Sequence, residues 1–412
     1  MRPVHLTFSG MDNRSNENAL PEIKLGEGKN APVVKKLRNA VNVNFDNSNQ
    51  VIFPRWGDQL LIAGETHSVK KFQFITLFVN SGTLYRLNPD NSATALKSGI
   101  GDEYLTYTEV GESVYFSNSS INGRIVNGEY RKWSPDAPPR QPDVSASPSG
   151  NMSGGEYRVA ITWVSDQESA TGLSTRVTVP EGGGISLSNF PLPPSDVNYV
   201  NIYVSSVNGE DLYLYDRYPS YIATLTLTAK ICTIPLETQF LMTVMPSKVI
   251  QAHYGRILCA YGDKILKTSV RRYGLHEPLD YMVFDSDVQV IVSLPNVVYV
   301  GTEHYLYRID AVGEVWTKTA LQDCGAVFRS VCYSPDGHRA YFMSNRGIIE
   351  ATSEKIKEIT YNDVAMPFFK SGCTAYIEKD GLQYLVFIGR EPTQNTLVNA
   401  DYAASEAARG QF

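Results

Sequence analysis

Hydrophobic and polar residues alternate in short runs along most of this chain. The stretch from Val288 to Thr319, VQVIVSLPNVVYVGTEHYLYRIDAVGEVWTKT, contains four such runs separated by Leu-Pro-Asn, Thr-Glu and Ala-Val-Gly-Glu. Alternation with a period of two, broken by turn-forming residues, is typical of β-strands that bury one face. The pattern therefore predicts four consecutive strands and no helix in this stretch.

The same plan recurs along the chain. The next unit, AVFRSVCYSPDGHRAYFMS, places the turn Ser334–Gly337 between two runs. Pro335 presets φ for a turn and Gly337 accepts a positive φ, so a hairpin is predicted there. Similar units occupy the ranges Phe72–Leu96, Tyr104–Trp133, Gln251–Val283 and Ser371–Gly389, and Arg38–Leu61 is a weaker copy.

A repeat of roughly 30–40 residues with four strands is typical of β-propeller blades. Such units close radially because an open stack of small sheets would leave strand edges unpaired. We therefore expect an all-β fold with a β-propeller of about six to seven blades. Residues 38–133 would form the first part of the propeller and residues 247–392 the second.

The region between these two parts breaks the repeat. Residues 134–149 are rich in proline and serine and are predicted to form a linker. Residues 150–246 show turn signals every 8–12 residues, as in a β-sandwich. One face of its first strand would carry four alternating apolar residues, Tyr157, Val159, Ile161 and Trp163. We expect an inserted immunoglobulin-like or fibronectin-like β-sandwich.

The first segment is polar and invites a test for ion binding. The stretch GMDNRSNENALP, Gly10–Pro21, does not fit a calcium loop of the EF-hand type. Counting from Asp12, the third position is Arg14 and the sixth is Glu17, where that loop requires Gly. Residues 1–37 are better interpreted as an assembly arm that becomes ordered on another surface.

The last segment, residues 393–412, is interpreted in the same way. Asp401 could cap a short helix that runs through Ala408 and ends at Gly410. For both terminal segments the alternative is a frayed chain end.

Composition narrows the class of protein. With 42% hydrophobic and 19% charged residues, the 412-residue chain can build a sizeable core. The net charge of −6 argues against a dedicated nucleic-acid-binding protein. We expect neither a signal peptide nor membrane insertion, since the most apolar stretch, VIVSLPNVVYV, is short and contains Pro295. The five cysteines contain no CxxC pair, so we expect buried free thiols.

No catalytic, cofactor-binding or metal-binding residue stands out. The six histidines are dispersed, and His276-Glu277 fails as HExxH because the fifth residue is Asp280. Gly182–Gly184 lacks the Lys-Ser/Thr of a phosphate loop and is expected to form a flexible hairpin tip. A carboxylate pair for glycoside cleavage stays open, although the sequence selects no pair among 43 Asp and Glu.

Basic clusters and tyrosines are the remaining candidates for contacts. Lys35-Lys36-Leu37-Arg38, Lys70-Lys71 and Arg271-Arg272-Tyr273 could touch phosphate, and Tyr273 could stack on a base, but solvated edges are the favoured interpretation. Many of the 25 tyrosines lie in strands, and some are expected to form protein–protein contacts.

Two regions of the chain, its opening and the expected insertion, resemble a family of virion proteins. The opening GMDNRSNENALP with LRNAVNVNFDNSNQVIFPRWG, and the inserted YRVAITWVSDQESATGLS with VNIYVSSVNGEDLYLYDRYP, are similar to the tail hub or nozzle proteins of short-tailed bacteriophages. The resemblance implies a structural protein of the virion tail, without cofactors, that is assembled in the host bacterial cytoplasm.

The resemblance also implies partners. They are copies of the chain in a cyclic ring (a hexamer in that family), portal or adaptor proteins, tail fibre or tail tip proteins, and genomic DNA passing through the channel. The alternatives are a propeller module that binds a carbohydrate or a protein, and a propeller glycosidase.

The assembly-arm interpretation gives a first prediction. Deleting residues 1–30 should leave the melting temperature of the propeller within a few degrees of the full chain, because few buried contacts are lost. The same deletion should impair incorporation into the particle. Differential scanning calorimetry and a particle-incorporation assay measure the two effects, and loss of the fold would mean that the arm supplies a closing strand.

Overall fold

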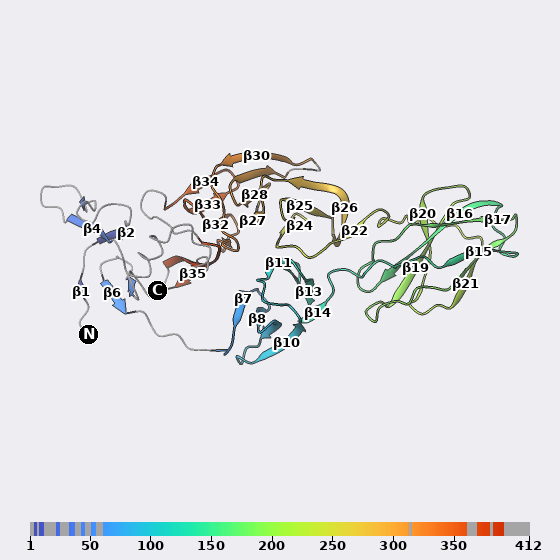
Figure 1. Cartoon of the computed structure of the whole chain (residues 1–412), viewed down its shortest axis with the longest axis horizontal. Helices are drawn as coiled ribbons and strands as arrows, with labels where there is room; N and C mark the ends of the chain where they lie inside the picture. Colours follow the sequence, from blue (N-terminus) through green and yellow to red (C-terminus); the bar gives the residue numbers. More distant parts are fainter. Residues whose placement is uncertain are drawn as a thin grey trace. The chain divides into compact units, whose positions relative to one another are not determined.

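The computed structural model describes residues 61–311, 313, 315–360, 369–379 and 382–390, together with short strands within the first 60 residues. The described part of the chain is all-β and contains no helix (Figure 1). Accordingly, no described segment is a helix with the length and hydropathy needed to cross a membrane. Residues 12–21 of the polar stretch, and all of 393–412, lie outside the described residues.

The chain divides into two compact units. The first unit consists of Met1–Gly64 and Phe284–Phe412, and the second of Glu65–Val283. The sheets of both units are small, and most are antiparallel meanders in which strands consecutive in sequence are neighbours. Strands of this kind need only short turns between them, which the Gly- and Asn-rich connections supply.

The second unit contains three such meanders. The sheet β7–β10 consists of β7 (Thr66–Lys71), β8 (Thr76–Asn80), β9 (Thr83–Leu87) and β10 (Ala93–Ser98). The sheet β11–β14 consists of β11 (Thr106–Val110), β12 (Ser113–Ser117), β13 (Asn122–Val126) and β14 (Glu129–Arg131). The sheet β22–β26 consists of β22 (Met242–Thr243), β23 (Val249–His253), β24 (Arg256–Tyr261), β25 (Lys264–Ser269) and β26 (Arg272–Val283).

Successive sheets of this unit bury their faces against each other. On β12, Val114 and Phe116 belong to a core shared with β7–β10, whereas Tyr115 belongs to a core shared with β22–β26. Side chains alternate between the two faces of a strand, so β12 serves both neighbours at once. The central sheet is therefore buried on both faces.

Strands β7, β11 and β23 of the three sheets are neighbours, and strands β10 and β14 at the other ends of their sheets are largely exposed. The Leu105 N–H donates to Ser68 Oγ at 2.8 Å, which joins the start of β11 to β7. The Ala252 N–H donates to Thr108 Oγ1 at 2.8 Å, which joins β23 to β11. By contrast, β10 and β14 carry mostly exposed or half-buried residues. Sheets that place one set of edge strands next to one another and the opposite edge strands in solvent have a β-propeller-like arrangement.

The two sheets of a sandwich lie between β14 and β22 in the sequence. One sheet has the order β15-β18-β21 and the other β17-β16-β19-β20 (Figure 1). Their bounds are β15 (Asp143–Ser147), β16 (Gly155–Val164), β17 (Thr175–Val179), β18 (Gly184–Ser188), β19 (Tyr199–Ser205), β20 (Leu212–Pro219) and β21 (Thr224–Leu227). A single core joins the two sheets, with Ile161 and Ile202 from one and Ile185 and Leu227 from the other.

Two expected boundaries differ from the structure. The linker predicted at residues 134–149 contains β15, which pairs with β18 over five positions. An edge strand buries little, so its sequence, DVSAS, carries only a weak apolar alternation. At the other end, β22 lies inside the range 150–246 expected for the sandwich, but Met242 and Thr243 pair with β26 of the neighbouring sheet.

The glycine run is tightly held, so the prediction of a flexible hairpin tip is wrong. Gly182–Gly184 crosses from β17 in one sheet to β18 in the other. The Asn151 and Met152 N–H groups donate to the carbonyls of Gly182 and Gly183 at 3.0 and 2.9 Å. A Cβ on Gly184 would lie 2.6 Å from a backbone oxygen. The glycines therefore permit close backbone approach, as short side-chain-free segments do.

The first unit repeats the meander plan. The sheet β27–β30 consists of β27 (Val288–Leu294), β28 (Val297–Thr302), β29 (Leu306–Asp310) and β30 (Thr317–Gln322), which confirms the four predicted strands. The sheet β31–β34 consists of β31 (Cys332–Tyr333), β32 (Arg339–Ser344), β33 (Gly347–Thr352) and β34 (Ile356–Glu358). Buried residues from both sheets form one core.

The remaining strands of the first unit are a hairpin and two small sheets. The hairpin is β35 (Ser371–Lys379) with β36 (Leu382–Arg390). One small sheet has the order β1-β6-β5, with β1 (Val4–His5), β5 (Val43–Phe45) and β6 (Val51–Pro54). The other has the order β2-β4-β3, with β2 (Phe8–Met11), β3 (Glu22–Lys24) and β4 (Val33–Leu37).

The predicted turn between β31 and β32 is confirmed. Gly337 has a φ of 70°, and its N–H donates to the carbonyl of Ser334 at 2.9 Å. The Asp336 carboxylate accepts from the Ser334 hydroxyl and from the His338 N–H, which closes the turn. Local turn chemistry is sufficient to place this hairpin.

The role of β15 gives a second prediction. A fragment of residues 142–230 should unfold cooperatively, because it contains both sheets and their core. A fragment of residues 150–230 lacks β15 and should be less stable by about 2 kcal/mol, from lost ladder hydrogen bonds and exposure of the β18 edge. Urea unfolding followed by tryptophan fluorescence measures the difference. Equal stability of the two fragments would show that β15 is dispensable.

Candidate interaction surface

A loop of the sandwich is tied to the sheet β11–β14 by a buried arginine. Arg124 on β13 is 5% exposed, and its guanidinium donates to the Asp166 carboxylate at 2.5 Å and to the carbonyl of Lys132 at 3.0 Å. With its amide nitrogen facing Trp133, Gln167 donates to the Trp133 carbonyl and accepts from Arg124. A buried guanidinium requires such an anion and acceptors. We call Arg124, Asp166 and Gln167 the clasp.

Glu168, which follows Gln167 of the clasp, holds the same loop against strands β16 and β19 of the sandwich. The Glu168 carboxylate accepts hydrogen bonds from Thr162 at 2.5 Å, Tyr203 at 2.6 Å and Asn201 at 2.9 Å. Burial and the neighbouring Glu168 raise the pKa of Tyr203, so its hydroxyl stays protonated and remains a donor. The loop is thus fixed at one end to β16 and β19 and at the other to the clasp.

We call the sheets β7–β10, β11–β14, β22–β26, β27–β30 and β31–β34 the blade-type sheets. The chain enters the sandwich after β14 and leaves it before β22, and both connecting segments contact β26. Trp133, which precedes the sandwich, is 2% exposed and donates from Nε1 to the carbonyl of Tyr273 at 2.5 Å. Glu237, which follows the sandwich, forms an ion pair with Arg272. Tyr273 also packs edge-on against Tyr115 with ring centroids 5.8 Å apart. The connection into the sandwich is therefore held by a buried indole hydrogen bond, and the connection out of it contacts the same strand through a solvent-exposed ion pair.

An exposed apolar row follows the sandwich. We call residues 228–241, between β21 and β22, the return segment. Its backbone is held along β20, where the Leu214 N–H donates to the Ile234 carbonyl at 2.7 Å and the Leu236 N–H to the Leu212 carbonyl at 2.8 Å. Yet Ile231 is 92% exposed and Phe240, at its end, 76%. Large apolar side chains held in solvent on a fixed backbone mark an interaction surface.

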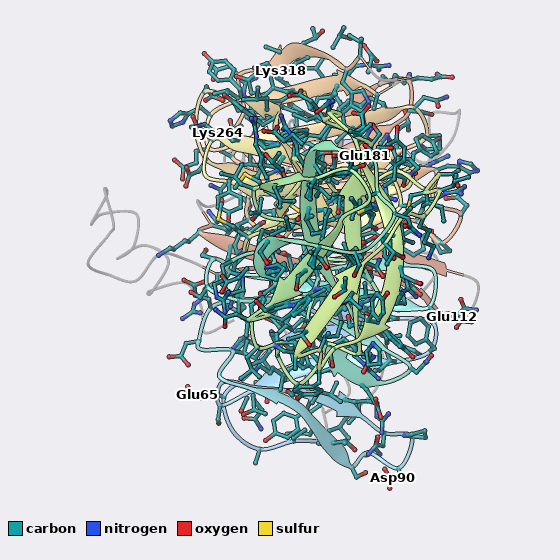
Figure 2. All side chains as sticks on the ribbon, turned by 90° about the vertical axis from the view of Figure 1, so that its right-hand side faces the viewer. Glu65, Asp90, Glu112, Glu181, Lys264 and Lys318 are labelled. Atoms are coloured by element: carbon teal, nitrogen blue, oxygen red, sulfur yellow. The ribbon has the colours of Figure 1, made fainter. Side chains whose placement is uncertain are left out.

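The charged groups at turns mostly face solvent. Asp90 and Glu112 project from connections between strands of the second unit (Figure 2). Hydrogen bonds from the side chain and backbone of Ser92 lower the pKa of Asp90. The Asp90 carboxylate therefore stays ionised at the surface.

Asp285 is an exposed carboxylate that accepts three hydrogen bonds from neighbouring hydroxyl groups. It accepts from Thr302 at 2.8 Å, Tyr307 at 3.0 Å and Ser286 at 2.8 Å. Burial opposes ionisation, but these hydrogen bonds outweigh it and lower the pKa of Asp285. A glycosidase acid needs a raised pKa, so Asp285 does not have the electrostatics of that role.

The structure disperses the histidines that the sequence analysis considered. His276 on β26 is buried and its Nδ1 contacts the carbonyl of Glu277 at 3.1 Å. Asp280 instead binds Lys267 at 2.5 Å. Among the described residues, no three His, Cys, Asp or Glu side chains gather as they would around a metal ion. His5 is a residue of β1, whose side chains lie outside the described part.

Three residues of the predicted basic clusters, Lys70, Arg272 and Tyr273, contact other parts of the chain. Lys70 donates to the carbonyl of Tyr107 at 3.3 Å and lies over the Phe72 ring. Arg272 and Tyr273 are held by Glu237 and Tyr115, as given above, so Tyr273 is not available to stack on a base. The side chains of Lys35 to Arg38 lie outside the described residues.

The five cysteines are unpaired, and they differ in exposure. Cys259 and Cys324 are buried, Cys232 and Cys332 are intermediate, and Cys373 is exposed. Burial raises the pKa of Cys259 to about 12 and that of Cys324 to about 11, so both thiols stay protonated and unreactive. The expectation of buried thiols is wrong for Cys373 on β35, which is exposed.

The sequence analysis missed the clasp and the return segment. One signal for the clasp was present: Arg124 interrupts the apolar run of β13, NGRIV, where a charge must find a partner. The return segment, KICTIPLETQF, carries apolar residues without regular alternation. Nothing in that pattern distinguishes an exposed row from a buried one.

The comparisons with known proteins identify no family. No protein-family model and no curated protein matches the chain. Among solved structures it is similar to apo AztD from Citrobacter koseri, with a TM-score of 0.31 and 10% identity, over 79% of this chain and 80% of that one.

Two further solved structures are similar to a comparable degree. The extracellular domain of the putative one-component system BT4673 from B. thetaiotaomicron has a TM-score of 0.30 and 11% identity, over 80% of this chain and 39% of that one. PorZ, a surface component of the type-IX secretion system of Porphyromonas gingivalis, has a TM-score of 0.30 and 10% identity, over 94% and 45%. These TM-scores are too low to support an inference about this chain.

The clasp gives a third prediction. Replacing Arg124 with Met should lower the free energy of unfolding by about 1.5–3 kcal/mol, because Asp166 and two carbonyl acceptors lose a charged donor. The matched control is Arg131→Met, since the ion pair of Arg131 with Glu129 is solvent-exposed and should change stability by about 0.5 kcal/mol or less. Urea unfolding measures both variants, and equal effects would contradict a structural role for the clasp.

Proposed function

We propose that this protein is a structural component of a bacteriophage virion tail, of the hub or nozzle type, that extends the DNA conduit below the portal and adaptor. In this proposal the blade-type sheets form a β-propeller of about six to seven blades. The immunoglobulin-like or fibronectin-like sandwich is inserted between two blades and offers a docking surface for tail fibres. The resemblance of the opening and inserted stretches supplies the identification.

The observation that carries the proposal is the fixed insertion of the sandwich. Arg124 and Asp166 hold its loop, and the Trp133–Tyr273 hydrogen bond holds the point where the chain leaves the blade-type sheets. An inserted domain on flexible linkers would move freely. A fixed one transmits force and keeps a binding surface at a constant position, which suits a part of a tail.

The conduit has to form between subunits. The centre of a single small propeller is filled by the side chains of its inner strands, so a DNA duplex cannot pass through it. Cyclic symmetry with a head-to-tail interface closes a wider channel. The net charge of −6 suits such a bore, because Lys and Arg lining it would bind phosphates and slow the passage of DNA.

The return segment is the favoured contact with a neighbouring copy or with the adaptor. Ile231 and Phe240 stay exposed although the backbone around them is hydrogen-bonded. A single chain gains nothing from holding these side chains in water, whereas a subunit interface would bury them.

Imaging or crosslinking of assembled particles tests the proposal. We expect a closed ring of roughly six copies around a DNA-sized channel, joined to the adaptor. Isolated protein can be monomeric if the adaptor templates the ring. The conduit proposal would be contradicted by a lone copy at the periphery of the particle, or by a monomer that cleaves glycans at the centre of its propeller.

A surface variant tests whether the return segment takes part in ring formation. The double change Ile231→Asp and Phe240→Asp should reduce ring formation about tenfold or more, while the melting temperature changes little, because both side chains are exposed. The matched control is Leu173→Asp, at a residue of the sandwich that is 90% exposed. Normal assembly of the double variant would remove the return segment from the interface.

A further inference from the structure

A row of polar side chains crosses the outer face of one sandwich sheet. Thr162 on β16 is paired with Asn201 on β19, and Asn201 is paired with Arg217 on β20. Directly opposed residues point to the same side of an antiparallel sheet. Their neighbours Ile161 and Ile202 lie in the core between the two sheets, so the row lies on the face away from that core.

The guanidinium of Arg217 is held in place although the residue is exposed. Its Nε donates to Asn201 Oδ1 at 2.9 Å, and its Cζ lies 5.7 Å from the centroid of the Tyr199 ring. Asn201 is 2% exposed and Tyr199 is 44% exposed. Two contacts fix the direction of the guanidinium, so less conformational entropy is lost when a ligand binds to it.

No carboxylate of the described residues neutralises this guanidinium. The adjacent Asp216 binds Lys230 at 3.0 Å instead. Within the same part of the chain, the two terminal nitrogens of Arg217 donate to no protein group. A guanidinium binds a carboxylate through two parallel N–H···O bonds, which are roughly twice as strong as hydrogen bonds between neutral groups. The row therefore contains a fixed and unused donor pair for a carboxylate.

An acceptor lies on the other side of Asn201. The Asn201 Nδ2 donates to Glu168 Oε1 at 2.9 Å, and the same oxygen accepts from Thr162 and Tyr203. Among the described residues nothing donates to the second oxygen, Glu168 Oε2, and this atom is not fully enclosed. An ionised carboxylate only accepts hydrogen bonds. A ligand that contacts this oxygen must therefore carry a donor.

We propose that this row binds an acidic sugar of the uronic acid class. The sugar carboxylate pairs with the terminal nitrogens of Arg217, a ring hydroxyl donates to Glu168 Oε2, and ring C–H groups pack on the exposed side chain of Tyr199. One amide group and two hydrogen bonds separate the guanidinium from the carboxylate of Glu168, so one ring-sized ligand reaches both.

Other ligands match the row less well. A neutral sugar leaves the guanidinium of Arg217 unpaired, and the acidic side chain of a peptide brings no hydroxyl to Glu168. The inference goes beyond the proposed place in a virion tail and does not depend on it.

Ligand-observed NMR on the isolated full chain tests the inference. Saturation-transfer difference titrations compare methyl glucuronide with methyl glucoside, which has a CH₂OH group in place of the carboxylate. We expect methyl glucuronide to bind with a Kd on the order of 1 mM, and methyl glucoside about tenfold more weakly or less, because the charged bidentate contact is lost. The α-amide of N-acetylglutamate represents an acidic peptide and should also bind about tenfold more weakly.

Two variants locate the binding. Arg217→Gln should weaken the binding of methyl glucuronide about tenfold or more, while the melting temperature stays within a few degrees, because Arg217 is exposed. The matched control is Arg176→Gln, at a residue of β17 in the same sheet that forms an exposed ion pair with Glu156. This control should bind methyl glucuronide as the unsubstituted chain does.

Four results would overturn the inference. Absence of saturation transfer from methyl glucuronide at about 10 mM would show that the row binds no such sugar. Equal affinity for methyl glucoside would remove the carboxylate contact, and equal affinity for the glutamate amide would assign the row to an acidic peptide. Unchanged affinity in Arg217→Gln would place the sugar elsewhere on the chain. Ring imaging is a separate experiment on assembled particles, so its failure leaves this result standing.

Discussion

The fold depends on the mutual burial of sheet faces. A four-stranded meander is too small to enclose a core of its own, so its apolar faces must meet those of a neighbour. On β12 this constraint is visible residue by residue, with Val114 and Phe116 facing one neighbour and Tyr115 the other. The shared core of β27–β30 and β31–β34 repeats it. A fold built this way has to end in a closed arrangement or in exposed apolar faces.

The same constraint explains how the sandwich is carried. The apolar residues of the two sandwich sheets form a core of their own. The attachment of the sandwich therefore uses polar contacts, chiefly the buried guanidinium of Arg124 with Asp166 and the Trp133 hydrogen bond to the Tyr273 carbonyl. Contacts of this kind fix the orientation of the sandwich more than they stabilise it, because a buried charge is satisfied only in one geometry. The sandwich thus has a core of its own and is joined to its neighbouring sheets mainly by polar contacts.

Two carboxylates of the described residues contrast with the exposed apolar side chains of the return segment. Asp285 accepts from three hydroxyl donors, and one oxygen of Glu168 accepts from Thr162, Asn201 and Tyr203, so these oxygens are engaged within the chain. The apolar row of the return segment, by contrast, is left in solvent on an ordered backbone. These features are consistent with the proposed place in a virion tail, where surfaces rather than reacting groups do the work.

Local chemistry let the sequence alone determine the strands and many turns. The alternation in Val288–Thr319 and the Pro335–Gly337 turn depend on nearby residues, so both were predicted correctly. The sequence did not reveal β15, an edge strand that needs little apolar alternation, nor the close backbone approach at Gly184. It also could not pair Arg124 with Asp166, because the two are 42 positions apart and meet only through the docking of the sandwich. Tertiary structure decided these contacts, since the energy of a buried charge depends on its surroundings and not on its neighbours in sequence.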